Sequence, residues 1–288
     1  MFTHDKFLEG QSVDLKDVLI NTTPIVTPFS TYMLGKTVKA TAPMVSWIEE
    51  EINLLSAKKQ AEGGNAPAYE ADSAEMLSNY LELVGATALV SNTAQASSAV
   101  GVSDLMAKEV ASKTKAIKMY IEDMLINGKK GFDAGTKTYS TGGILEQIHD
   151  TNKFTGKSLT VKDFEKVLES LYNAGVNDNM TVFLPASLKQ VINTFDSVTF
   201  MARDKELGFD TEVYTSVFGQ VRFVLTEKLG ANKLFVVNGD YLEMPVLIPF
   251  NGKQEPVSGS KQSIYLETQL GLKLLNRKAA ASFEIVTA

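Results

Sequence analysis

The feature that most constrains the fold is a long amphipathic segment at residues 102–128, VSDLMAKEVASKTKAIKMYIEDMLING. Its apolar residues return at spacings of three and four, which predicts one helix with a single buried stripe. We expect Ser103 to cap its N-terminus and Asn127-Gly128 to end it. About 25 residues at 1.5 Å each give a rod of roughly 38 Å, about twice the usual helix length. Such a helix can act as a spine for the surrounding chain.

The two sides of this helix are expected to differ in burial. Both charge signs occur on the polar faces, unlike the basic face of a membrane-surface helix. The expected buried stripe is Val102, Leu105, Met106, Val110, Ile117, Ile121, Met124 and Leu125. The residues expected on the solvent faces are Lys108, Glu109, Lys113, Lys115 and Glu122.

Composition excludes several classes of protein. No apolar run approaches the roughly 20 residues that a membrane-spanning helix needs, and the acid-containing N-terminus is unlike a signal peptide. Cysteine is absent, which removes disulfides and thiolate chemistry. The net charge is −6, and of 28 basic residues only Arg203, Arg222 and Arg277 are arginine. A tight nucleic-acid binder is therefore not expected, because arginine is the preferred side chain for phosphate and base recognition.

Residues 36–92 are predicted to form a β-hairpin that projects from the body. The strands are expected at 36–52 and 79–95, where β-favouring residues are frequent. Residues 54–74 between them contain Gly63-Gly64-Asn65, which predicts a flexible tip. Trp47, the only tryptophan, is expected to pack at the base of the hairpin.

The remaining segments are predicted to be an N-terminal arm and an α/β lobe. Residues 1–35 contain X-Pro steps at Pro24 and Pro28, which favour extended backbone. In the lobe, Thr160 is expected to cap a helix that ends near Gly175, and Pro185 to start another. The buried stripe of the first helix is expected to be Phe164, Val167, Leu168, Leu171 and Tyr172. Strands are predicted at 180–184, 211–217, 220–226 and 233–237.

No catalytic, cofactor-binding or metal-binding residue is predicted. Gly35-Lys36-Thr37 lacks the upstream glycine of a phosphate-binding loop, because Ser30 stands in its place. His4 and His149 are the only histidines, and we interpret His149 as a helix-end or surface residue. The run Glu49-Glu50-Glu51 is interpreted as a solvated or interface-facing cluster, not as an acid–base site.

The order of the segments resembles a known family. The motifs that carry the resemblance are TPIVTPFSTYMLGKT, VSWIEEEIN, LVSNTAQAS, IEDMLINGKKG, TGGIL, FLPASLKQVI, VYTSVFGQVRFVLTEKL and YLETQLGLKLLNRKAAASFEIV. Together they resemble a major capsid protein of a tailed double-stranded DNA bacteriophage, with the Hong Kong ninety-seven type fold. The resemblance implies an α+β fold. Its parts would be an N-terminal arm (1–35), an extended β-hairpin loop (36–92), a peripheral domain with a long spine helix (93–138 and 241–288) and an α/β axial domain (139–240).

The resemblance also implies a function. The chain would assemble with itself into hexamers and pentamers of an icosahedral shell that encloses double-stranded DNA without sequence-specific binding, in the virion, after assembly in the host cytoplasm. Partners would include a portal and scaffolding or decoration proteins, with no cofactor and no membrane. No long scaffolding region precedes the arm, so scaffolding would be separate, absent or already removed. No self-crosslinking Lys–Asn pair is identified. The expected assembly contacts are Pro24, Pro28, Phe29, Gly63, Gly64 and Asn65.

Two alternatives remain open from the sequence. One is an encapsulin-like shell that encloses cargo enzymes. The other is an intracellular α/β ligand-binding protein or an enzyme with a shallow site. A cargo-binding or substrate pocket would favour these alternatives, whereas large mixed interfaces without a dominant pocket would favour a capsid.

Overall fold

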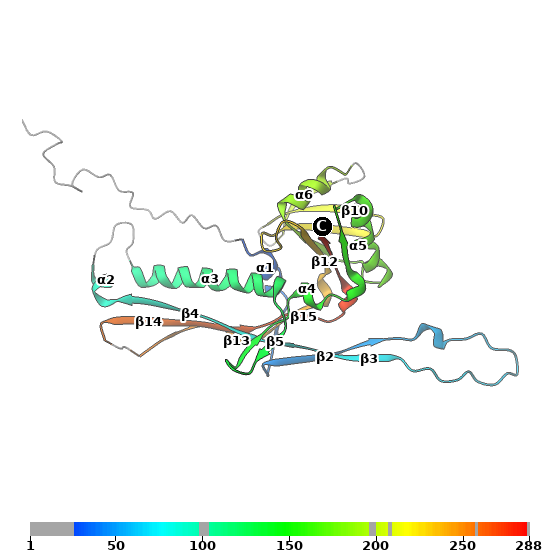
Figure 1. Ribbon diagram of the computed structural model, residues 1–288, viewed down its shortest axis with the longest axis horizontal. Helices are drawn as coiled ribbons and strands as arrows, with labels where there is room; N and C mark the ends of the chain where they lie inside the picture. The colour runs from blue at the N-terminus through cyan, green and yellow to red at the C-terminus, as the bar shows by residue number, and fades with distance from the viewer. Residues whose placement is uncertain (1–25, 98–103, 196–199, 207–208, 257–258, 287–288) are drawn as a thin grey trace, which may run out of the picture.

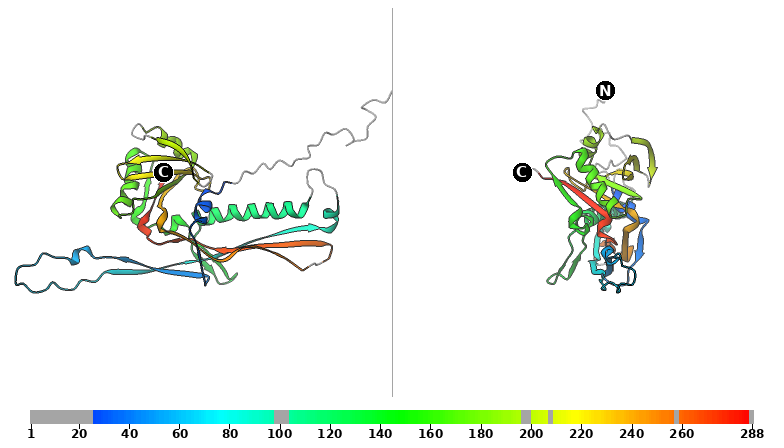
Figure 2. Two further views of the ribbon diagram at one scale, coloured as in Figure 1. Left: turned by 180° about the vertical axis from the view of Figure 1, so that it is seen from behind. Right: turned by 90° about the vertical axis from the view of Figure 1, so that its right-hand side faces the viewer.

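The computed structural model describes residues 26–97, 104–195, 200–206, 209–256 and 259–286, and it is elongated (Figure 1). An α/β lobe occupies one part of the molecule. A long helix lies over two long strands and extends away from the lobe in one direction, and a narrow hairpin extends past the lobe in the other (Figures 1 and 2). The elongated chain therefore exposes more surface than a compact domain of the same length.

The long helix, α3, spans Leu105–Asn127 and ends at Gly128 as predicted. Its cap is Asp104, whose side chain accepts a hydrogen bond from the Ala107 amide at 3.1 Å; the expected cap, Ser103, lies outside the described residues. Burial is concentrated in the second half of the helix, at Ile117, Met124, Leu125 and Ile126. The placement of Glu122 on a solvent face was wrong, because this side chain is 0% exposed.

A five-stranded sheet lies beneath α3. Its order is β1 (Thr37–Lys39), β13 (Leu242–Gln254), β14 (Lys261–Leu270) and β4 (Glu82–Ser91), and β15 (Lys273–Leu274) also pairs with β13. The β1–β13 pair is parallel and the other pairs are antiparallel. The Tyr120 hydroxyl of α3 donates to the Glu82 carboxylate, and this hydrogen bond raises the pKa of Tyr120 to about 12. Gly85 is required in β4 because a side chain there would collide with the ring of Tyr265.

The hairpin consists of β2 (Met44–Glu51) and β3 (Ser73–Tyr80), which pair with each other in an antiparallel ladder. The projecting hairpin predicted for residues 36–92 is therefore present, but its second strand was misplaced. Residues 73–80 form that strand, whereas most of the predicted segment 79–95 is β4 of the five-stranded sheet. Both segments favour strand, and propensity does not specify the pairing partner. Trp47 is half-buried at the base of the hairpin and does not belong to a core cluster.

The lobe contains a seven-stranded sheet. Its order is β7 (Lys153–Gly156), β16 (Ala280–Ile285), β12 (Lys233–Asn238), β8 (Met180–Leu184), β11 (Gly219–Leu225), β10 (Phe209–Ser216) and β9 (Phe200–Glu206). The predicted strand positions in the lobe agree with this sheet to within two residues. The last strand, β16, was expected with the peripheral domain, but it lies between β7 and β12. Its alternating apolar residues complete the core of the lobe.

Two helices of the lobe follow their sequence signals. Helix α5 (Val161–Asn173) begins with a capping box between Thr160 and Asp163, and α6 (Ala186–Asn193) follows Pro185. The predicted buried stripe of α5 is correct except for Tyr172, which is 52% exposed and lies beside the ring of Phe218. The remaining short elements are α1 (Pro28–Leu34), α2 (Asn92–Ala96), α4 (Ile144–Gln147), β5 (Gly131–Asp133) and β6 (Thr138–Ser140).

Two apolar clusters hold these parts together. One lies between α5, α6 and the seven-stranded sheet. The other joins the lobe to the spine, because it combines Phe29 of α1, Leu125 of α3, Phe235 of β12 and Leu266 of β14. The lobe and the spine therefore share a core.

Replacement of Ile117 by aspartate tests whether the inner face of α3 is core. Ile117 is 3% exposed within the shared cluster, so Ile117→Asp should cost several kcal/mol by burying an unpaired charge. Solubility and thermal unfolding of the purified chain are the measurements. The control is Lys115→Asp, which adds the same side chain on the exposed face two residues away. Equal behaviour of the two variants would contradict the assignment.

Candidate functional site

Two of the N-terminal contact residues expected from the sequence, Pro28 and Phe29, lie inside the subunit. Pro28 and Phe29 are buried, and the Phe29 ring makes edge contacts with Phe183 at 5.0 Å and Phe235 at 5.4 Å between centroids. Both side chains are thus covered within the subunit, and their contact with another copy stays a proposal. The extended backbone predicted here is also wrong from Pro28 onward, because proline suits the first turn of α1 as well as an extended segment. Pro24 lies outside the described residues.

Helix α1 is held by a buried carboxylate of the spine. Glu122 accepts hydrogen bonds from the Phe29 amide at 2.9 Å and the Ser30 amide at 2.6 Å, one on each oxygen. These amides belong to the first turn of α1, which has no partner within the helix for them. In the described part of the chain no ion pair includes Glu122, and burial raises its pKa, although hydrogen bonds to the carboxylate oppose the shift. Sequence pattern missed this residue because a glutamate on a helix is normally solvated.

The expected contacts at the hairpin tip lie on the surface. Gly63, Gly64 and Asn65 are all exposed. Gly63 has a φ of +74°, which glycine adopts readily, and no atom lies within 4 Å of where its Cβ would be. The tip is therefore open to contact with another molecule, and its role in assembly stays a proposal.

Several large apolar side chains of the hairpin are exposed. Ile48 and Met76 are opposite each other on β2 and β3 and are 70% and 75% exposed. Further exposed apolar side chains follow toward the tip, namely Ile52, Leu54, Leu55 and Tyr69. Exposed apolar surface of this extent indicates a protein–protein contact.

An apolar groove lies on the body, where α1, α3 and β13 meet. Its volume is about 480 Å³. The side chains that line it include Leu34, Ile117, Ile121, Met244, Val246 and Phe250. Leu34 and Phe250 are exposed at its rim. The exposed surface of the groove is mainly apolar, although Ser30, Lys118 and several threonines also line it, so it is better suited to apolar side chains than to a charged substrate.

The run Glu49-Glu50-Glu51 has partners within the chain. The Glu49 carboxylate bonds the Arg277 amide at 2.8 Å and the Arg277 Nε at 2.7 Å, and Glu51 pairs with Lys278 at 2.8 Å. The solvated interpretation was therefore wrong for Glu49, whose side chain is 19% exposed, whereas Glu51 is exposed as expected although it pairs with Lys278. Lys278 lowers the pKa of Glu51 through its hydrogen bond and its charge. These pairs neutralise the acids and leave no free carboxylate pair for acid–base chemistry here.

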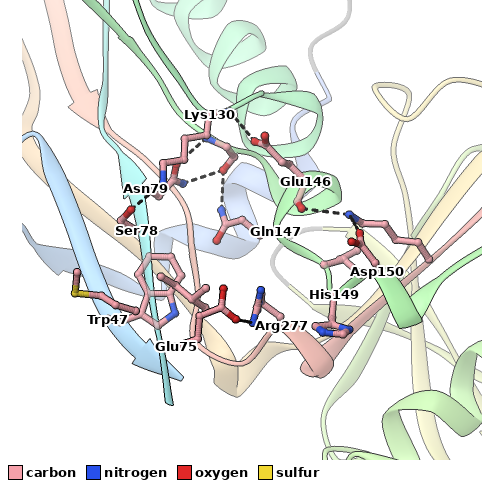
Figure 3. Close-up of a pocket in the computed structure, with 15 residues that line it drawn as sticks. Trp47, Glu75, Ser78, Asn79, Lys130, Glu146, Gln147, His149, Asp150 and Arg277 are labelled. Carbon is pink, nitrogen blue, oxygen red and sulfur yellow. Dashed lines mark hydrogen bonds and ion pairs between the residues drawn. The ribbon is translucent and has the colours of Figure 1, made fainter. Parts of the chain in front are cut away.

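A second, polar cavity of about 400 Å³ lies between the hairpin and the lobe (Figure 3). Trp47, Glu75, Lys130, His149 and Arg277 are among the side chains around it. His149 caps a short 3-10 helix through its Nδ1, in keeping with a helix-end residue.

Within the described residues no three His, Cys, Asp or Glu side chains gather closely enough to hold a metal ion. Among the helices described, none is long and apolar enough to cross a membrane.

Comparison with known proteins decides between the alternatives. The sequence model of the SU10 major capsid protein family matches residues 3–287, nearly the whole chain. The chain belongs to this family. No curated protein matches it. Its membership in a major capsid protein family makes it a structural, non-enzymatic protein of the virion capsid that associates with itself into a shell.

Solved structures agree on the fold. The capsid asymmetric unit of cyanophage A-1(L) is 14% identical, with 100% of each chain covered and a TM-score of 0.73. The capsid of Myoviridae phage XM1 is 12% identical, with 97% of this chain and 99% of the other covered and a TM-score of 0.65. The predicted α+β capsid fold is thereby confirmed. The SrpI encapsulin complex of Synechococcus elongatus is also similar, at 10% identity, coverage of 93% and 92%, and a TM-score of 0.61. This match is weaker, so the encapsulin alternative is not favoured.

Removal of the Glu122 carboxylate should loosen α1. Glu122→Ala leaves the Phe29 and Ser30 amides without their acceptor, and an unsatisfied buried amide costs about 1–3 kcal/mol. Urea unfolding of the unassembled variant should show this decrease in the free energy of unfolding. Asp123→Ala, at the exposed neighbouring position, should change stability far less. A loss for Glu122→Ala no greater than for this control would refute the anchoring role.

The pH dependence of stability should also report on Glu122. Burial raises its folded-state pKa above the ordinary value of 4.5. Between the unfolded-state and the folded-state pKa of Glu122, the folded state therefore binds more protons than the unfolded state. The contribution of Glu122 to the free energy of unfolding falls as pH rises through that window. Urea unfolding at a series of pH values should show the wild type losing stability relative to Glu122→Gln as pH rises above 4.5. A wild-type curve that runs parallel to the glutamine curve would show that the pKa is not raised.

Proposed function

We propose that the chain forms the hexamers and pentamers of an icosahedral shell that encloses a double-stranded DNA genome. The observation that carries the proposal is the projecting hairpin, whose exposed apolar side chains are left uncovered by the described part of the subunit. A member of a capsid protein family with such a face needs neighbours to cover it. Closed shells repeat each contact many times, so individually modest contacts suffice for a stable assembly.

The apolar face of the hairpin is proposed to pack on a neighbouring subunit. The groove between α1, α3 and β13 supplies a complementary apolar surface of suitable size. Gly63, Gly64 and Asn65 at the tip are proposed to contact the neighbour as well. Their small side chains and the positive φ of Gly63 permit close approach of another backbone.

Substitution of Ile48 tests the hairpin contact. Ile48→Asp places a charge on the exposed apolar face, so it should leave the subunit folded and soluble but prevent the face from being buried at an interface. Ile48→Leu keeps the apolar character and should assemble normally. Negative-stain microscopy distinguishes regular shells from small particles. Regular shells from Ile48→Asp would rule out burial of this position between subunits.

DNA is proposed to be held by enclosure and not by specific binding. The chain carries a net charge of −6 and only three arginines. Scattered lysines on an inner surface can still make weak contacts with phosphates, and such contacts weaken steeply with salt. Enclosure requires a sealed shell and does not require affinity between one subunit and DNA.

Unassembled subunits should therefore not retain duplex DNA. At near-physiological salt and micromolar protein, a mobility-shift measurement should show free DNA, because acidic, arginine-poor surfaces do not neutralise phosphates. The same measurement at low salt serves as the control for weak lysine contacts. Retention at physiological salt would contradict enclosure without affinity and would point to a nucleic-acid-binding role for the lobe.

Specific partner proteins are proposed on the same basis. A genome-filled shell needs an opening for DNA, so a portal protein is the first partner proposed. Scaffolding and decoration proteins are further candidates, and assembly is proposed to occur in the host cytoplasm. Co-purification of the chain with such proteins from infected cells tests each of them.

A further inference from the structure

The base of the hairpin places two acidic residues directly opposite each other. Glu49 of β2 and Glu75 of β3 are cross-strand partners on the same face. Like charges in this position repel, and a two-stranded hairpin alone is only marginally stable. Arg277 lies over both: its Nε pairs with Glu49 at 2.7 Å, and its Nη2 pairs with Glu75. One guanidinium therefore joins the two strands and ties them to the segment that follows β15.

Two neighbouring positions on the same face of β2 also contact cations of this segment. Glu51, two residues beyond Glu49, pairs with Lys278 at 2.8 Å. Trp47, two residues before Glu49, lies under Lys273, whose Nζ is 5.6 Å from the centroid of the indole ring. Every second residue from Trp47 to Glu51 thus meets a cation from residues 273–278. Alternation along the strand puts all three contacts on one face.

The other contacts of the hairpin with the body lie at its inner end, where the buried Asn79 of β3 bonds Thr141, Gly142 and Leu272, and Lys130 donates to Ser78. Neither β2 nor β3 pairs with a strand other than its partner. The cavity of about 400 Å³ lies beside Trp47, Glu75 and Arg277, so the hairpin is not packed tightly against the lobe (Figure 3). A protruding element that is held by ion pairs, with free volume beside it, can change direction without loss of an apolar core.

We propose that Arg277 is a charge latch that fixes the direction of the β2–β3 hairpin relative to the lobe. With the latch closed, Glu49 and Glu75 hold the hairpin at one angle. With it open, the two carboxylates repel and the hairpin swings about its base. The latch acts within one subunit, so this inference stands whether or not the hairpin packs on a neighbour.

Spin-label distance measurements test the latch directly. The chain has no cysteine, so Lys59→Cys near the tip and Glu169→Cys on α5 introduce labels at two exposed positions. Labelled chain is diluted into unlabelled chain, so that only distances within one subunit are recorded, whether or not shells form. The otherwise wild-type chain should give a narrow distance distribution. Arg277→Gln should give a broader distribution with a shifted maximum.

Salt and a matched variant separate the latch from general destabilisation. At about 1 M salt the Debye length falls to about 3 Å, so the wild-type distribution should broaden toward that of Arg277→Gln, whose own distribution should hardly change. Lys233→Gln removes an ion pair with Glu284 of similar length, 3.0 Å, inside the seven-stranded sheet. This control should keep the wild-type distribution.

Three outcomes would overturn the proposal. The first is a narrow, unshifted distribution for Arg277→Gln, and the second is a wild-type distribution that is already as broad as that of the variant.

The third outcome concerns the pairing of β2 with β3, which amide hydrogen exchange in these two strands monitors. If Arg277→Gln unzips the strands, the triple variant with Glu49→Gln and Glu75→Gln removes the repulsion and restores pairing. A narrow distribution in that paired triple variant would show that the direction does not depend on the latch.

Discussion

The hydrogen bonds from the first turn of α1 to the Glu122 carboxylate fix the junction on which the rest of the subunit depends. They hold Phe29 between the lobe and the spine, where its ring packs against Phe183 and Phe235. Without that ring the shared cluster would lose one of the side chains that join the spine to the lobe. A buried carboxylate is costly unless its oxygens are satisfied, so the helix amides and the carboxylate each stabilise the other's burial.

Outside this junction, different parts of the subunit are held by different kinds of interaction. Apolar packing holds the lobe and the spine together, whereas ion pairs with Arg277 and Lys278 connect the hairpin to the body. The outward face of the hairpin is apolar and exposed. This division suits a shell protein, because the rigid part keeps its shape while the hairpin, which we propose to meet neighbours, can adjust. A polar joint also keeps the apolar surface available for other copies.

Local signals in the sequence were reliable where a short stretch of chain decided the outcome. The capping box at Thr160, the strand at Met180–Leu184 and the helix start after Pro185 all depend on residues a few positions apart. These local signals gave wrong predictions where segments distant in the sequence decided the structure. Glu122 was assigned to solvent because its partners are about 90 residues away, and most of β3 was left out of the predicted strand because its partner strand is not encoded locally.

The sequence alone determined the long helix, the α/β lobe, the absence of thiol chemistry and, through the order of its motifs, the capsid family. Only the tertiary structure decided that α1 belongs to the core, that β16 completes the sheet of the lobe and that Arg277 spans Glu49 and Glu75. The physical reason is the range of the interactions. Periodicity and capping act over one or two turns, whereas burial and ion pairing join residues that only the folded chain brings together.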